Sequence, residues 1–346
     1  MDLGLSSDQE AIRDIFGSFF ADRAGPDQAR AAQPLGFDPE GWARLGETGA
    51  PGMGVPVDAG GGGASLADLV VVAEEAGANV SPLPLVDHTV TARLLAGLDA
   101  VGDDVVSGAA VAGLAVRPAT GGLARSVPTG AVAEVLVALE DDRLVVVRGA
   151  APGEAQPNHA DMPIAHRSVQ DGEVLAEGPE AVAAHARAVD EWRALTGSLL
   201  VGATRMAIEM AVDYVSERHQ FGRPVGSFQA VQHGLADLPG LCDGARLLVA
   251  KTAWAGDRPG EGVADMGDNE VTDFAALAAM ALVFAGEAAL RATDRSLHYH
   301  GGYGFAEEYD IQLYYRRVRG WAQVLDDPAR ECRRLAGLLL NDREVD

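Results

Sequence analysis

The stretch "SERHQFGRPVGSFQAVQHGLADL", residues 216–238, places basic, aromatic and amide side chains in one connection between two apolar, alanine-rich segments. These side chains are Arg218, His219, Phe221, Arg223, Gln229, Gln232 and His233. The chain as a whole is acidic, since 51 acidic residues against 27 basic ones give a formal net charge of -24. This field repels anionic ligands, so a phosphate-bearing cofactor needs local basic residues or helix N-termini to bind. The stretch is therefore a candidate contact for such a cofactor.

Length and composition predict a large globular protein. With 346 residues and 48% apolar content, the chain can bury a substantial core, and its length indicates two or three structural units. The acidic N-terminus lacks the basic region of a signal peptide, and charges interrupt the apolar runs before they reach membrane-spanning length. We therefore expect a cytoplasmic protein that does not contact a membrane. The net charge also argues against nucleic-acid binding, because it would repel a phosphate backbone.

Hydrophobic periodicity predicts helices, then strands, then helices again. Residues 1–108 should form an N-terminal helical domain, 109–185 a small β domain, and 186–346 a C-terminal helical bundle. Two hairpins are expected in the β domain, with turns at Asp141-Asp142 and Asp171-Gly172. The fold class is therefore mainly α with a small β domain.

Several helix boundaries can be predicted from local signals. The C-terminal helices are expected at 190–219, 228–255, 268–298, 308–319 and 328–341. Pro239 lies inside the second of these and removes one backbone donor, so we expect a kink or break near residues 235–239. Near the N-terminus, Ser7 and Glu10 have the spacing of a capping box, and Ser65 opens another helix.

The cysteines and the first glycine-rich stretch predict neither a metal site nor a phosphate loop. Cys242 and Cys332 follow no metal-ligand pattern and are expected to be reduced core thiols. The stretch "VDAGGGGASLADL", residues 57–69, lacks the Gly-Lys-Ser/Thr ending of a phosphate loop and is interpreted as a flexible entry to a helix. His298 and His300 alternate instead of following the spacing of a helical metal site, so no metal is predicted.

A second glycine-rich stretch, "HYHGGYGFAEEYDIQLYYRR" at 298–317, carries more glycines than the end of a helix requires, and these allow the backbone to approach a ligand closely. Together with the first stretch, it resembles the two signatures of the acyl-CoA dehydrogenase family. Upstream, "WARLGETGAPGMGVPVDAGGGGASLADLVVVAEEAG" at 42–77 is similar to the family's N-terminal motif. The resemblance covers nearly the whole chain. It implies a helical N-terminal domain, a small β domain and a C-terminal four-helix bundle.

The resemblance implies a role for the basic stretch. In this family, the connection reaches across a subunit interface and holds the adenosine diphosphate half of the neighbour's flavin adenine dinucleotide (FAD). A guanidinium is a strong partner for pyrophosphate oxygens, and a phenyl ring offers an apolar wall. The residues that match the family's cofactor-binding positions, and are the candidates here, are Arg218, Phe221, Gln229, His298, Gly301 and Gly302.

The same resemblance raises a question about catalysis. The family's base is a glutamate that removes the α-proton of an acyl-CoA while a hydride passes to FAD. Counting from the two signatures, the positions at which family members carry this glutamate are occupied here by Leu325 and Trp192. The acidic neighbours of these positions, and hence the candidate bases, are Asp326, Asp327 and Glu191. Asp327 followed by Pro328 also has the pattern of a helix N-cap.

The β region departs from the family pattern. Residues 110–183 contain no Trp and no match to the Thr/Ser-rich motifs that hold the isoalloxazine ring in the family. The resemblance therefore indicates the shorter, auxiliary subunit of an α2β2 acyl-CoA dehydrogenase of the steroid side-chain type, in which a longer partner chain supplies the base. Two alternatives remain: a self-sufficient homo-oligomeric dehydrogenase that uses one of the candidate acids, and a flavin-free scaffold or binding protein of the same fold.

Overall fold

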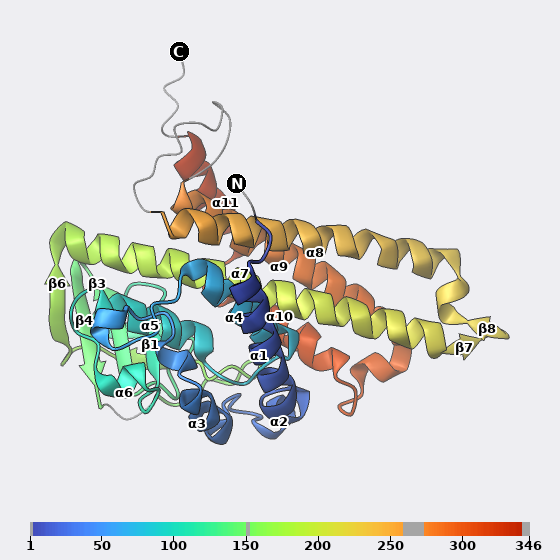
Figure 1. Cartoon of the computed structure of the whole chain (residues 1–346), viewed down its shortest axis with the longest axis horizontal. Coiled ribbons are helices and arrows are strands. Elements are labelled where there is room, and N and C mark those ends of the chain that lie inside the picture. Colours follow the sequence, from blue (N-terminus) through green and yellow to red (C-terminus); the bar gives the residue numbers. More distant parts are fainter. Residues whose placement is uncertain (1–2, 150–152, 259–272, 341–346) are drawn as a thin grey trace, which may run out of the picture.

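The computed structural model describes residues 3–149, 153–258 and 273–340. Its first part is helical, as the sequence predicts (Figure 1). The α-helices of this part are α1 (Ser7–Arg23), α2 (Pro26–Ala31), α3 (Pro39–Glu47), α4 (Leu66–Ala78), α5 (Leu85–Ala96) and α6 (Asp103–Val106). Ser65 caps α4 as expected. The capping box of α1 is formed by Ser6 and Gln9, so the predicted Ser7–Glu10 box is wrong by one residue.

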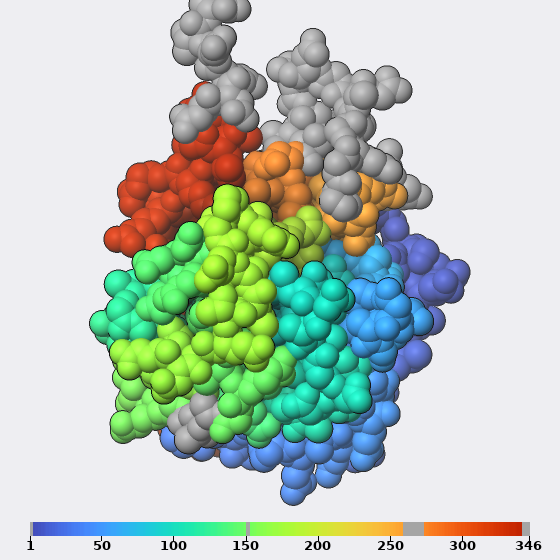
Figure 2. Space-filling view, turned by 90° about the vertical axis from the view of Figure 1, so that its left-hand side faces the viewer, coloured from blue at the N-terminus to red at the C-terminus, as the bar shows by residue number. Residues whose placement is uncertain are grey.

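The strands form two sheets in the middle of the chain. They are β1 (Ala112–Leu114), β2 (Leu123–Val127), β3 (Val135–Glu140), β4 (Arg143–Arg148), β5 (Ala165–Ser168) and β6 (Glu173–Glu177). One sheet has the order β1-β3-β4-β6, with β1 parallel to β3 and the other pairs antiparallel, and β2 pairs with β5 in a second sheet. Figure 2 shows this end of the molecule, where strand residues (green) lie beside the last N-terminal helices (teal) and α11 (red) projects above them.

One of the two expected hairpins is present. β3 and β4 pair across Asp141-Asp142, and Asp141 adopts a left-handed conformation with φ 54°. The hairpin predicted at Asp171-Gly172 is wrong, because β5 pairs with β2 whereas β6 pairs with β4. The Asp-Gly turn therefore connects two different sheets.

The C-terminal part is a bundle of long helices. Its elements are α7 (Gly178–Glu217), α8 (Gln229–Gly256), α9 (Phe274–Tyr299), α10 (Ile311–Gln323) and α11 (Pro328–Leu340). α7, α8 and α9 pack along one another and form the long axis of the molecule (Figure 1). α7 starts directly after β6, well before residue 190, because Gly178 turns the chain with φ 69° and a proline occupies the first turn of the helix.

Pro239 does not break α8, so the expected break is wrong, whereas the expected kink stays a prediction. One helix runs through it from Gln229 to Gly256. Pro239 lies on the exposed side of the helix, next to the buried Leu238, and α8 packs against both α7 and α9. Packing along the whole helix therefore outweighs the loss of one backbone hydrogen bond.

α4 and α7 cross with their backbones in contact. A Cβ atom placed on Gly77 would lie 2.0 Å from the carbonyl oxygen of Leu199. A Cβ atom on Gly202 would lie 1.9 Å from the carbonyl oxygen of Glu74. Both distances are far below van der Waals contact, so these two glycines set the spacing between the N-terminal helices and the bundle.

The N-terminus of α4 is closed by an acidic side chain from the end of α8. The carboxylate of Asp257 accepts hydrogen bonds from the backbone N–H groups of Leu66 at 2.7 Å and Ala67 at 3.0 Å. This end of the helix follows the glycine-rich stretch 57–69. Its free donors are therefore satisfied within the chain, in agreement with a helix entry instead of a phosphate loop.

Two further expectations need correction. α7 and α9 are long and apolar enough to cross a membrane by length and composition, contrary to the expected interruption by charges. In their most apolar windows, 67% and 56% of the residues are buried inside the structure, which is typical of core helices. Cys242 is buried as expected, but Cys332 is exposed.

Candidate functional site

The basic connection forms a small hairpin that projects from one end of the bundle (Figure 1). β7 (His219–Gln220) pairs with β8 (Arg223–Pro224), and Phe221 and Gly222 form the turn with φ 53° and 79°. Such a turn needs two left-handed residues, and a phenylalanine there is uncommon. Phe221 is 92% exposed at the tip, so its ring is directed away from the chain's own core.

The hairpin lies beside the second glycine-rich stretch. α9 ends at Tyr299, and the 3-10 turn η4 (Gly301–Phe305) leads on to α10. The two segments enclose an open cavity of about 620 Å³. It is lined by Tyr214, Arg218, Gln220, Val225, Tyr299, His300, Gly301, Gly302, Tyr303 and Ala306. The structure therefore brings Arg218, Gly301 and Gly302 together, although they are far apart in the sequence.

The cavity offers donors that are not used elsewhere. Arg218 is exposed, its Cζ lies 5.4 Å from the centre of the Tyr303 ring, and among the described residues its guanidinium forms no ion pair. The hydroxyl of Tyr299 has no hydrogen-bond partner in the described part of the chain, but it is buried against Gly234 of α8 and does not face the cavity. A Cβ atom on Gly301 or Gly302 would meet nothing within 4 Å, so the backbone there is open to a ligand.

The remaining candidate residues do not line this cavity. Gln229 is the exposed first residue of α8, and His298 is exposed in the last turn of α9. His300 is not among the predicted cofactor-binding residues, but it lines the cavity. Its ring stacks on Tyr214 with the ring centres 4.4 Å apart. Burial lowers the pKa of His300. The aromatic lining was missed because tyrosines at a helix end are indistinguishable in sequence from core residues.

A second location is the surroundings of Trp192, where the family resemblance leads us to expect one of the two base positions. Trp192 is buried, and its indole N–H donates a hydrogen bond of 2.9 Å to Oδ1 of Asp87. The cavity beside these residues measures about 50 Å³. A three-ring flavin does not fit into this space. Leu325, at the other base position, is buried as well.

The three acids that were candidate bases have structural partners. Glu191 pairs with Arg93 at 2.8 Å and Arg187 at 3.0 Å. Burial alone raises the pKa of Glu191, but the hydrogen bond and charge of Arg93, together with Arg187, hold it below its ordinary value. Glu191 is therefore a firmly ionised structural residue.

Asp326 and Asp327 lie at the start of α11. Oδ1 of Asp327 accepts a hydrogen bond of 2.8 Å from the backbone N–H of Ala329, which is the geometry of a helix cap. Asp326 pairs with Arg330 at 3.1 Å. Both acids thus act on the local structure of α11.

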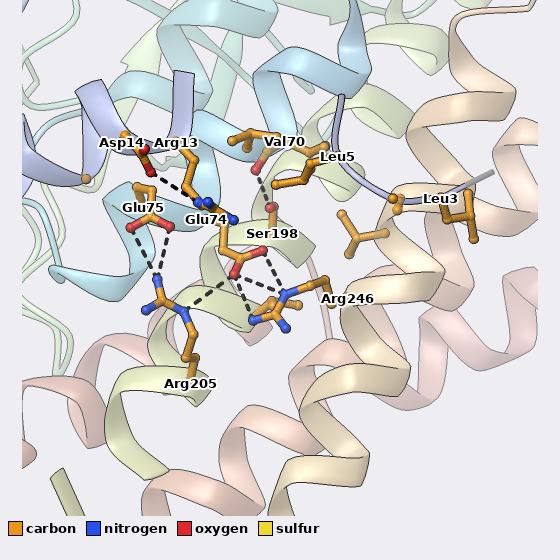
Figure 3. A pocket seen from close by; sticks show the side chains of 16 residues that line it. Leu3, Leu5, Arg13, Asp14, Val70, Glu74, Glu75, Ser198, Arg205 and Arg246 are labelled. Carbon is orange, nitrogen blue, oxygen red and sulfur yellow. Dashed lines mark hydrogen bonds and ion pairs between the residues drawn. The ribbon is translucent and has the colours of Figure 1, made fainter. Parts of the chain in front are cut away.

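A larger cavity, about 850 Å³, lies elsewhere, between the N-terminal segment, α1, α4, α7 and α8 (Figure 3). Its charged groups are paired with one another. Arg205 contacts Glu75 at 3.0 Å, and Arg246 contacts Glu74 at 2.9 Å. Because these charges neutralise each other, this cavity offers less for an anionic cofactor than the one at Arg218.

Comparisons with known proteins agree with this geometry. Residues 6–107 match the model of the acyl-CoA dehydrogenase N-terminal domain, and residues 182–322 match that of the C-terminal domain. The acyl-CoA dehydrogenase IpdE2 of Mycolicibacterium smegmatis is 32% identical over 337 residues, which cover 96% of this chain and 98% of that protein. IpdE2 of Mycobacterium tuberculosis is 31% identical over 335 residues, covering 95% and 96%.

Solved structures share the fold over the full length. The Tcur3481-Tcur3483 steroid acyl-CoA dehydrogenase matches with a TM-score of 0.84 and 26% identity, covering 98% of this chain and 99% of the other. The ChsE4-ChsE5 complex from Mycobacterium tuberculosis matches with a TM-score of 0.85 and 22% identity, covering 100% of both chains. The family resemblance and the predicted fold class are thus confirmed: this chain belongs to the acyl-CoA dehydrogenase family, whose members are FAD-dependent oxidoreductases.

Proposed function

We propose that this chain is the auxiliary subunit of a heteromeric, FAD-dependent acyl-CoA dehydrogenase. The observation that carries the proposal is the contrast between the cavity at Arg218 and the cavity at Trp192. The cavity at Arg218 measures about 620 Å³ and is open, whereas the cavity at the base position Trp192 measures about 50 Å³. The chain can therefore contribute to a cofactor site that belongs to a neighbour, but it has little room for a reactive ring and a thioester of its own.

The open cavity has the chemistry that the diphosphate half of FAD requires. The unpaired guanidinium of Arg218 can form charge-assisted hydrogen bonds to phosphate oxygens. The backbone at Gly301 and Gly302 admits close approach of the cofactor. When bound, FAD accepts the hydride of the dehydrogenation. The residues of this chain hold and orient the far half of the cofactor.

The surface around this cavity supports a partner chain. Phe221 and Phe305 are 92% and 76% exposed, and Tyr303 and Tyr309 are exposed nearby. Exposed aromatic side chains gathered around a cavity are typical of a protein interface. Two solved relatives carry two protein names each, ChsE4-ChsE5 and Tcur3481-Tcur3483, which favours a longer acyl-CoA dehydrogenase chain as the partner.

The remaining parts of the proposal follow from the same arrangement. The substrate is an acyl-CoA thioester bound by the partner, and the partner supplies the glutamate base. A cytoplasmic location is also part of the proposal, and the burial of α7 and α9 within the chain supports their role as core helices. We also propose that the chain divides into three domains, with boundaries at residues 108 and 185.

Co-expression tests this function. The chain is purified alone and together with the longer acyl-CoA dehydrogenase chain encoded nearest to it, and flavin absorbance per protein is measured for both. We expect little flavin in the chain alone and a stoichiometric flavin in the complex. Flavin and acyl-CoA dehydrogenation in the chain alone would favour a homo-oligomeric enzyme. A complex without flavin or activity would favour a scaffold.

A further inference from the structure

The hairpin of β7 and β8 carries a second arginine, Arg223, which does not line the cavity at Arg218. Arg223 is exposed, and its Cζ atom lies 4.0 Å from the centre of the Phe228 ring. Within the described part of the chain, its guanidinium forms no ion pair and no side-chain hydrogen bond. An aromatic ring therefore holds the guanidinium in place, but no described acid balances its charge.

The surroundings of Arg223 are built from short local contacts. β7 and β8 are joined by a two-residue turn, in which Phe221 and Gly222 adopt left-handed conformations. Phe228 is the N-cap of α8, and its ring meets that of Phe221 edge-on with the ring centres 6.2 Å apart. The 3-10 turn η3 (Val225–Ser227) connects β8 to α8 and packs against α7 and α8. Phe221, Arg223 and Phe228 thus form one preorganised projection, here called the hairpin knob.

The composition of the hairpin knob is that of a protein interface. Arginine and aromatic residues are enriched at the centres of such interfaces, and they contribute much of the binding energy there. Phe221 is 92% exposed, and a protein that covers it also covers Arg223, two positions along the chain. A guanidinium that leaves water without a counterion is costly. The protein that covers the hairpin knob therefore has to supply an acidic group.

Two kinds of acidic group are available at such an interface, namely the diphosphate of the cofactor and a side-chain carboxylate. The diphosphate fits the cavity that Arg218 lines, and Arg223 lies outside that cavity, against Phe228 at the start of α8. A guanidinium that stacks on a ring through its face still offers its edge to a carboxylate, through two parallel hydrogen bonds.

We propose that Arg223 is a docking residue that pairs with an aspartate or glutamate carboxylate of the longer acyl-CoA dehydrogenase chain, at the edge of the contact that covers Phe221. This inference rests on the proposed function, because it takes the partner from there. It assigns separate tasks to two arginines of one hairpin. Arg218 holds the cofactor, whereas Arg223 selects the partner chain.

Dilution of the purified complex tests the docking role. The fraction of intact complex is measured by mass photometry at several protein and salt concentrations. Arg223→Gln should weaken the affinity about tenfold and Arg223→Glu about a hundredfold, because the partner's carboxylate is left unpaired or meets a like charge. Arg223→Gln should also reduce the salt dependence of the affinity. Arg125→Glu, which makes the same change of charge at an exposed position of β2, is the matched control and should assemble as the wild type does.

Flavin content separates the two acidic groups. At protein concentrations where assembly is complete, the Arg223→Gln complex should hold as much flavin as the wild type, whereas Arg218→Ala should lose flavin. Loss of flavin in a fully assembled Arg223→Gln complex would assign Arg223 to the cofactor and overturn the proposal.

The proposed function and this inference fail in different ways. A wild-type chain that forms no complex with the longer chain refutes the proposed function, and this inference with it. A complex that forms, and whose affinity is the same in the wild type, Arg223→Gln and Arg223→Glu, refutes the inference alone.

A zero-length crosslink identifies the acidic group on the partner. The sequence contains a single lysine, Lys251, so Arg223→Lys adds a second side-chain amine, at the hairpin knob. A carbodiimide condenses an amine with a carboxylate that it touches, and should join this amine to an aspartate or glutamate of the longer chain. Mass spectrometry of the digested complex locates the link, and the wild-type complex provides the background. No additional link to the partner in the assembled Arg223→Lys complex would contradict the pairing.

Discussion

The indole N–H of Trp192 donates a hydrogen bond of 2.9 Å to Oδ1 of Asp87, and this buried pair joins α7 to α5. The hydrogen bond satisfies the indole but does not offset the burial of the carboxyl, whose pKa rises to about 6. The pair thus keeps a carboxyl group with a raised pKa in the contact between α5 and α7.

This relationship predicts how stability depends on pH. The folded-state pKa of Asp87 lies above its unfolded value of about 3.9, so the folded state binds more protons between these pH values and stability falls as the pH rises through them. Asp87→Asn should reduce the loss of unfolding free energy between pH 5 and pH 7.5 by about 1 kcal/mol. Urea denaturation at both pH values measures this. The exposed Asp326→Asn should leave the difference unchanged, and an equal loss in wild type and Asp87→Asn would contradict the shift.

Arg218→Ala should weaken flavin retention in the assembled complex roughly tenfold to a hundredfold, because charge-assisted hydrogen bonds contribute about 1.5 to 3 kcal/mol. The fold should persist, since Arg218 is an exposed residue of a connection. Flavin content after dialysis is the measurement. Arg44→Ala, which removes an exposed guanidinium paired with Glu40 at 3.4 Å on α3, serves as the control and should retain flavin. Full retention in Arg218→Ala would rule out the cofactor contact.

The candidate bases predict separate effects on turnover and stability. Asp326→Asn and Asp327→Asn should leave turnover of the complex nearly intact, whereas loss of a true general base costs 10²-fold or more, about 3 kcal/mol of barrier. Asparagine also caps helices well, so α11 should remain stable. Steady-state rates at equal flavin content test this. A collapse of turnover in either variant would move the catalytic base into this chain.

Glu191→Gln should act on stability instead. It leaves Arg93 and Arg187 without their carboxylate, and breaking a buried ion pair on one side costs about 3 to 5 kcal/mol. Because both arginines keep partial access to solvent, we expect the lower end of this range. Chemical denaturation gives the value, and the rate of the complex below its unfolding temperature should be unchanged. A stable but inactive Glu191→Gln complex would instead indicate that Glu191 is the catalytic base.

Gly202→Ala tests the crossing of α4 and α7. The added methyl group would lie 1.9 Å from the carbonyl oxygen of Glu74, so the helices must separate, at a cost of about 2 to 4 kcal/mol. Gly240→Ala is the matched control in α8, where a Cβ atom meets nothing within 4 Å. It should stabilise the chain by about 0.5 to 1 kcal/mol because alanine favours helices. Equal unfolding free energies for the two variants would disprove a close contact.

The sequence predicts those features that depend on local signals or on the family signatures. The order of helices and strands, the cap at Ser65 and the meeting of Arg218 with Gly301 all follow from short motifs. The misplaced hairpin has a physical reason: an Asp-Gly pair specifies a turn, but the partner strand is chosen by contacts far away in the chain. Pro239 shows the same limit, because packing of α8 on two neighbours exceeds a local backbone preference.

The groups in the small cavity could not be inferred in this way. Trp192 and Asp87 are separated by 105 positions, and the partner of the indole is decided only when α5 and α7 pack together. The sequence signal for this pair is Asp87, an acidic residue inside the apolar segment that forms α5.

The carboxylate of Asp257 at the start of α4 bears on the order of events during synthesis. Two of the four free donors of α4 are satisfied by a side chain that follows 190 and 191 positions later, so the ribosome exposes this helix end, capped by Ser65, long before Asp257 is made. Until then, the backbone N–H groups of Leu66 and Ala67 lack their protein partner. We therefore expect the two helical parts to become stable together, once the end of α8 has emerged, and a chain truncated before Asp257 to remain a target for proteolysis.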